Sequence, residues 1–388
     1  MSGPAVAVSP APRCHALDGA RVLAVLLLIP FHAAAVFYAG DLGTFYVTNP
    51  ESSRALGGFL VLVHQWHMPL FFFLAGSASW YSLRSRGAGA YLRERLQRLL
   101  LPLGVGILVL VPPQVYVHDL QSVDSALGYL RFYPHFFDGI RPAGHFEWAH
   151  LWFLAYLLVI TLLCLPLLGR LSAQASPSPP EGGAGWRVSL GSLLLLALPL
   201  MLSEALLRPR WPGFQNLYDD WANLLLYLLY FVFGYLFCHQ GGFWVVLDRR
   251  RWLLLALAAL SMAVFLGLTL SGATPVPGDD SPAAQLFQAF RGWNSWCAVL
   301  ALVALARRFL QAPHPLVSYG SKAAMPLYLL HQPVLVGLGW WVVPLPLAIG
   351  AKFALICAGS LLISLGLYEG VIRRLGPLSP CFGLVGRP

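Results

Sequence analysis

Charged residues are scarce in this chain of 388 residues: 11% are charged, while 58% are hydrophobic. Because roughly a quarter of the residues in soluble domains are charged, this composition excludes an ordinary water-soluble protein. Lysine is nearly absent and occurs only as Lys322 and Lys352. The formal net charge of +9 therefore rests on arginines, which stand singly or in small groups between apolar segments. Without a contiguous basic tract, nucleic acid is not expected as a partner.

Sequence patterns for metals, disulfides and nucleotides are also missing. No two cysteines have CxxC spacing, and no Gly-rich phosphate-binding loop accompanies the arginines. We therefore expect no disulfide framework, no metal site and no ATP hydrolysis. The cysteines are Cys14, Cys164, Cys238, Cys297, Cys357 and Cys381.

Apolar segments of about twenty residues recur along the whole length, and each can cross a bilayer as a helix. They predict an all-α fold, a polytopic integral membrane helical bundle of about ten transmembrane helices. The first segment lacks a convincing cleavage site, so we expect it to remain as a signal anchor. No internal repeat is evident. The segments span 17–40, 55–83, 99–117, 149–169, 187–204, 221–239, 251–271, 286–310, 322–345 and 349–371.

The arginines are concentrated in alternate connections, which predicts that both termini face the cytoplasm from the inner membrane. The longest outer connection, 118–148, contains acidic and aromatic residues and is expected to form a structured cap. The domain division follows from this topology. It comprises a cytoplasmic tail 1–16, a transmembrane domain 17–371 with a flexible Ser/Pro/Gly-rich cytoplasmic linker 171–186, and a cytoplasmic tail 372–388.

Two titratable residues interrupt the first apolar segment. Arg21 and His32 are eleven positions apart, which places them within roughly 20° of one helix face and about 16 Å apart along the axis. Arg21 can be an interfacial anchor paired with Asp18, or a functional group. His32 can be a packed, hydrogen-bonded histidine. Since a buried imidazole in hydrocarbon is costly, a functional role is favoured for His32.

Further imidazoles are expected at a similar depth. His64 and His67 lie in the second segment, three residues apart, and His331 lies in the ninth segment with Tyr328 one turn earlier. A metal is disfavoured because carboxylates and cysteines at ligand spacing are absent nearby. The cluster therefore indicates proton-transfer catalysis.

Polar groups also mark the two membrane boundaries. Arg95 and Arg98 share one helix face in RLQR, where they can anchor the topology or clamp phosphates. On the outer side, Glu147 stands beside His145 and His150. Glu147 can be a capping carboxylate in an interfacial belt, or it can orient a histidine or an acceptor hydroxyl in catalysis.

Five segments resemble the membrane acyltransferase-3 superfamily, within the branch that includes glucan biosynthesis protein C and sugar O-acetylases. They occur in family order over nearly the whole chain. In place of the GVD-like stretch of many relatives, this chain has HMP, which matches that branch. The segments are LDGARVLAVLLLIPFH at 17–32, HMPLFFFLAG at 67–76, RLQR followed by LLLP at 95–102, HLWFL at 150–154 and SYGSKAAMPLYLLHQPVL at 318–335.

The resemblance implies transfer of an acyl group, acetyl or succinyl, from acyl-CoA to a hydroxyl of a carbohydrate or lipid-linked glycan. Acyl-CoA would be a co-substrate, with no permanently bound cofactor. By motif position, His32 would be the general base or carry a transient acyl link, and Arg21 would orient the donor. Arg95 and Arg98 would receive the phosphates of coenzyme A. The residues expected along the substrate path are His64, His67, Tyr328 and His331.

Two other functions remain open from the sequence. A multi-spanning transporter or flippase for a sugar, lipid or acyl group also uses buried polar residues, but it is expected to show repeats and broken helices at paired positions. A non-catalytic membrane scaffold leaves the imidazoles at matching depth unexplained.

Overall fold

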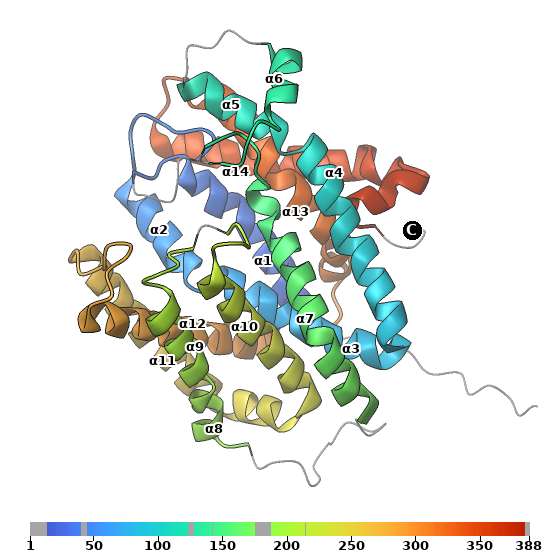
Figure 1. Cartoon of the computed structure of the whole chain (residues 1–388), viewed down its shortest axis with the longest axis vertical. Helices are drawn as coiled ribbons and strands as arrows, with labels where there is room; N and C mark the ends of the chain where they lie inside the picture. The colour runs from blue at the N-terminus through green and yellow to red at the C-terminus, as the bar shows by residue number, and fades with distance from the viewer. Residues whose placement is uncertain are drawn as a thin grey trace, which may run out of the picture.

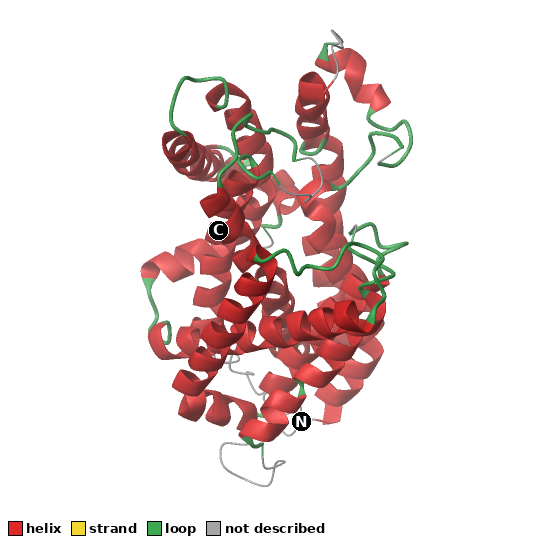
Figure 2. Ribbon diagram, turned by 90° about the vertical axis from the view of Figure 1, so that its left-hand side faces the viewer, coloured by secondary structure: helices red, strands yellow, loops and turns green. Residues whose placement is uncertain are grey.

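The protein, described here by a computed structural model, is built from α-helices and their connections (Figure 1, Figure 2). The structure describes residues 14–39, 45–122, 128–141, 143–174, 188–213 and 215–384. Within these ranges, an isolated bridge between Ile140 and Phe146 is the only β-type pairing. The described residues therefore confirm the all-α prediction.

Every one of the ten predicted segments contains a helix. α1 contacts α2, α3, α12, α13 and α14 and lies near the middle of the bundle (Figure 1). A π-helical turn, η1 (Leu96–Leu100), joins α3 to α4. The α-helices are α1 (His15–Ala35), α2 (Arg54–His64), α3 (His67–Arg95), α4 (Leu101–Val109), α5 (Pro112–Ser122), α6 (Tyr129–His135), α7 (Trp152–Gln174), α8 (Leu190–Leu195), α9 (Ala197–Leu207), α10 (Trp221–His239), α11 (Gly242–Leu270), α12 (Pro282–Phe309), α13 (Pro315–Val342) and α14 (Ile349–Gly370).

Eight helical stretches of the described chain are long and apolar enough to cross a membrane. One of them, Arg54–Gln121, contains both the second and the third predicted segments. α13 is not among the eight, although it has 28 residues. These stretches identify a membrane protein, and the number of ten spans stays a prediction.

Prolines explain where predicted segments are interrupted. The second segment breaks at Gln65 and Trp66 into α2 and α3. Pro69 has no N–H for the Gln65 carbonyl, and its ring collides with that carbonyl in a continuous helix. The third segment likewise breaks before α5, which begins with two prolines. The first break places the α2–α3 junction against Phe31 of α1, the neighbour of His32.

α3 and α10 approach each other closely because glycines face each other across the contact. A Cβ atom on Gly76 would lie 1.8 Å from the carbonyl oxygen of Phe231, and one on Gly234 would lie 1.9 Å from that of Phe73. Ser77 fills the contact and donates a 3.0 Å hydrogen bond to the carbonyl of Gly234. Small residues thus set the distance between these two membrane helices.

The predicted outer cap 118–148 is structured where it is described. It contains α6 and an ion pair of 2.7 Å between Arg141 and Glu147. The predicted linker 171–186 and tail 1–16 lie mostly outside the described residues, although α7 continues to Gln174. In the predicted tail 372–388, residues 372–382 contain two short 3-10 turns.

Candidate active site

The histidine of α1 and the histidine of α13 meet in the interior. Nδ1 of His32 lies 3.2 Å from Nε2 of His331, and the ring centroids are 4.9 Å apart. The same Nδ1 is 3.0 Å from the carbonyl oxygen of Leu28, one turn earlier in α1. Nδ1 of His331 is 2.6 Å from the carbonyl oxygen of Tyr328. His32 and His331 are therefore in contact, and Tyr328 lies one turn before His331 in α13.

These contacts assign the ring protons. Because a carbonyl oxygen only accepts, Nδ1 of His331 donates to Tyr328, and Nε2 of the neutral ring keeps its lone pair. Nδ1 of His32 then faces two acceptors, the Leu28 carbonyl and His331 Nε2, so it carries the hydrogen of that ring. Nε2 of His32 is left with its lone pair available as a base.

A third imidazole, His150, completes this cluster. Its ring centroid is 5.1 Å from that of His331, and its Nε2 donates to the carbonyl of Leu329 at 3.1 Å. The Leu329 carbonyl is available because Pro333, four residues later in α13, has no N–H to donate to it. The hydroxyl of Tyr328 donates to the His150 carbonyl at 2.5 Å. α13 thus ties the start of the α7 region to the centre of the bundle.

His64 and His67, at the junction of α2 and α3, both pack against the Phe31 ring of α1. The His64 ring stacks on Phe31 at 6.4 Å, and the His67 ring meets Phe31 edge-on at 5.8 Å. His67 Nε2 also donates to the carbonyl of Ala24 in α1 at 2.8 Å. The depth of both residues in the membrane stays a prediction, and their contacts are with α1 rather than with His331.

His32 is the accessible member of the three-histidine cluster. His331 and His150 are buried, whereas His32 is partly exposed. The Phe45 ring stacks on His32 with a centroid distance of 6.1 Å. His32 is therefore the member of the cluster that is open to the surface, beside Phe45.

Arg95 and Arg98 belong to a basic group at the α3–α4 junction. Arg95 Nη2 is 3.1 Å from Ser79 Oγ, and Arg98 Nε is 3.0 Å from a carboxylate oxygen of Glu94. Arg98 interacts electrostatically with Arg95, Arg86 and Arg21. Four guanidiniums thus gather around the carboxylates of Glu94 and Asp18, leaving an excess of positive charge. Because η1 shifts the helical register within RLQR, the two arginines make different contacts.

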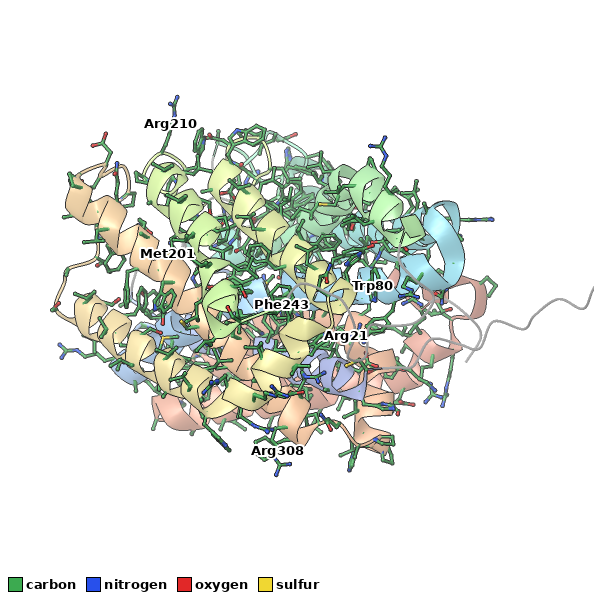
Figure 3. The ribbon with its side chains drawn as sticks, turned by 90° about the horizontal axis from the view of Figure 1, so that it is seen from below. Arg21, Trp80, Met201, Arg210, Phe243 and Arg308 are labelled. Carbon is green, nitrogen blue, oxygen red and sulfur yellow. The ribbon has the colours of Figure 1, made fainter. Side chains whose placement is uncertain are left out.

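Arg21 pairs with Asp18 near the start of α1, as the anchor interpretation predicts. It and Trp80 of α3 lie near the middle of the bundle in Figure 3, whereas Arg210 and Arg308 point outward at opposite sides. The basic group to which Arg21 belongs is about 16 Å along α1 from His32. A donor bound to both positions must therefore extend along this helix.

An apolar cavity of about 250 Å³ also borders α1, on another face. Its α1 residues lie about 120° around the helix from Arg21 and His32. Val25 and Leu28, which are near the Arg21–His32 face, are buried. The cavity therefore does not connect Arg21 with His32 in this conformation. It is lined from α1 by Ala20, Leu23, Ala24 and Leu27, and from the other elements by Trp66, Leu70, Leu302, Leu305, Ala306, Phe309 and Leu310.

Glu147 is placed apart from the histidine cluster. Its carboxylate pairs with Arg141 rather than with His145, which lies 3.3 Å from Asp119. Burial raises the pKa of Glu147 above its ordinary value, opposed by the nearby Arg141 and by a hydrogen bond with Tyr46. Glu147 thus contributes an ion pair to the 118–148 connection, and none of the contacts described for it involves a histidine.

The sequence interpretation missed a second buried polar group. Glu204 of α9 is 1% exposed and pairs with Arg208 at 2.6 Å and with Arg291 of α12 at 3.6 Å. The available signal was a charge inside the predicted segments 187–204 and 286–310, because such charges require a partner or a function.

Comparison with known proteins identifies the family. A family model described as an acyltransferase domain matches residues 15–369. The chain belongs to the acyltransferase-3 family. As a member, it is a membrane enzyme that transfers acyl groups other than aminoacyl groups.

Curated relatives of this acyltransferase-3 protein carry the name glucans biosynthesis protein C. The protein from Escherichia coli (strain K12) is 25% identical over 347 residues, which cover 86% of this chain and 85% of the relative. The protein from Shigella dysenteriae serotype 1 (strain Sd197) is 24% identical with the same coverage. Both relatives are thus similar over most of their own length.

Proposed function

We propose that this acyltransferase moves an acetyl or succinyl group from acyl-CoA to a hydroxyl of a carbohydrate or lipid-linked glycan. The observation that carries the proposal is the contact between His32 and His331, which leaves His32 Nε2 as an accessible base. The names of the relatives support a glucan as the acceptor. The protein lies in the inner membrane with cytoplasmic termini, so that the basic group faces cytosolic acyl-CoA.

In the proposed reaction, His32 Nε2 removes the proton of the acceptor hydroxyl as its oxygen attacks the thioester carbonyl. The tetrahedral intermediate collapses, the C–S bond breaks, and coenzyme A leaves as a thiolate. The imidazolium of His32 returns the proton to that sulfur, giving the ester and free CoA. His331 keeps His32 in the required tautomer throughout and is a positioning residue.

Transfer is tested with purified protein in lipid nanodiscs. Acetyl-CoA and succinyl-CoA are supplied separately with a glucan oligosaccharide, and the product is followed by mass spectrometry. Addition of one acyl mass to the oligosaccharide supports the proposal, and absence of transfer from both donors contradicts it. Transport of the oligosaccharide without acylation would favour the transporter alternative.

Replacing Arg95 and Arg98 together with alanine is expected to raise the KM for acyl-CoA by about tenfold or more, because two phosphate contacts are lost. The KM for the acceptor is expected to change little. The control is Arg249→Ala with Arg250→Ala, an exposed arginine pair of α11. Equal changes in both KM values would show that Arg95 and Arg98 act only on membrane topology.

Replacing His331 with alanine is expected to lower kcat by about 10²-fold, because His32 loses one of the two acceptors that fix its tautomer and orientation. The KM for acyl-CoA should stay near the wild-type value. His331→Gln retains an acceptor oxygen and is expected to recover part of the loss. Steady-state kinetics of both variants provides the measurement, and an unchanged kcat in His331→Ala would rule out the positioning role.

A further inference from the structure

A buried polar cavity lies at the break between α2 and α3. It has a volume of about 20 Å³, which is enough for one water-sized group. Three helices other than α2 and α3 contribute to its wall, namely α9, α10 and α12. The polar or aromatic residues that line it are His64, Gln65, Glu204, Tyr227, Arg291 and Ser295.

The side-chain oxygen of Gln65, in the wall of this cavity, receives no hydrogen bond. The residue is 8% exposed, and its Oε1 atom has no hydrogen-bond partner. An unsatisfied buried carbonyl is costly in a membrane protein, where lipid offers no donor. A ligand that donates a hydrogen bond would remove this cost.

The charges of the lining define the ligand chemistry. The Glu204 carboxylate and the Arg291 guanidinium face the same small space and are 3.6 Å apart. Glu204 is paired with both Arg291 and the buried Arg208, so the lining holds ion pairs and offers no unpaired charge to an ionic ligand. A hydroxyl suits such a lining, because it donates to Gln65 or Glu204 and accepts from Arg291.

The cavity is close to the proposed transfer site. The His64 ring stacks on Phe31 at 6.4 Å, and the Phe31 ring meets the His32 ring edge-on at 5.2 Å. One aromatic side chain therefore separates a residue of the cavity wall from the proposed base.

We propose that the cavity formed by Gln65, Glu204 and Arg291 is a subsite for a non-reacting hydroxyl of the acceptor. The subsite rests on the proposed function and adds a reason for polyhydroxylated acceptors: one hydroxyl reacts at His32 while another is held behind Phe31. The same hydroxyl chemistry can come from a water molecule, and kinetics distinguishes the two sources.

The test is Gln65→Met, which keeps the length of the side chain and removes the acceptor oxygen. With a glucan oligosaccharide as the probe, the acceptor KM is expected to rise about tenfold while the acetyl-CoA KM stays unchanged. Gln65→Glu retains an acceptor oxygen and is expected to stay near the wild-type KM. Gln285→Leu, at the outer end of α12, is the control.

An unchanged acceptor KM in Gln65→Met would show that the cavity holds only water and would overturn the proposal. An equal rise in Gln65→Glu and Gln65→Met would overturn it as well, because retaining the oxygen would then have no effect. If Gln65→Met does not fold, Gln65→Leu, which also lacks the acceptor oxygen, takes its place in the same comparison with Gln65→Glu and the wild-type protein. Failure of the wild-type protein to transfer an acyl group would instead contradict the proposed function.

Discussion

His32→Ala is expected to reduce acyl transfer by about 10³-fold, because a positioned general base contributes roughly 10² to 10⁴ to such reactions. His32 is the partly exposed histidine of a cluster whose other members are buried, and its Nε2 carries the lone pair. The measurement is the initial rate of acyl transfer to a glucan oligosaccharide at saturating acyl-CoA.

The matched control for this variant is His135→Ala. His135 lies on the exposed helix α6, where its Nδ1 is 2.7 Å from Asp138. This control should transfer at the wild-type rate, and both variants should reach the membrane in similar amounts. Wild-type activity in His32→Ala would refute the assignment of the base.

Gly76→Ala is expected to destabilise the fold more than any exposed substitution, because the added Cβ would lie 1.8 Å from the Phe231 carbonyl oxygen. Overpacking of this kind typically costs about 1 to 3 kcal/mol, and the fixed backbones of α3 and α10 offer little room for adjustment. We expect the apparent Tm to fall by about 5 °C or more.

Thermal unfolding in detergent, followed by size-exclusion chromatography, measures this effect. Gly267→Ala is the control, since an added Cβ there, in the last turn of α11, meets nothing within 4 Å. If both variants melt at the wild-type temperature, the close approach of α3 and α10 does not contribute to stability.

The sequence alone predicts the positions of the helical segments and part of the candidate site. Long apolar segments predict membrane helices directly. The spacing of Arg21 and His32 predicts that they share one face of any regular helix. The matching depth of His32 and His331 followed from counting residues inward from each membrane boundary. Their 3.2 Å contact then needed only that α1 and α13 be neighbours.

Other parts of the site depend on contacts that no local pattern contains. The burial of His150 requires the Leu329 carbonyl, which Pro333 leaves available in a distant helix. Glu204 and Arg291 were visible as charges within apolar runs, but their pairing depends on the packing of α9 against α12. The sequence suggested that Glu147 orients a neighbouring histidine, whereas in the structure its carboxylate pairs with Arg141.

The histidines of the centre are held by peptide carbonyls, those of Leu28, Tyr328 and Leu329. A peptide oxygen is the same whatever side chain its residue carries. Substitutions at Leu28 and Leu329 can therefore accumulate during evolution without loosening the imidazoles, provided that the helix geometry persists, whereas Tyr328 also uses its hydroxyl. Alignments of relatives would show such positions as variable, although their backbone atoms orient the reacting group.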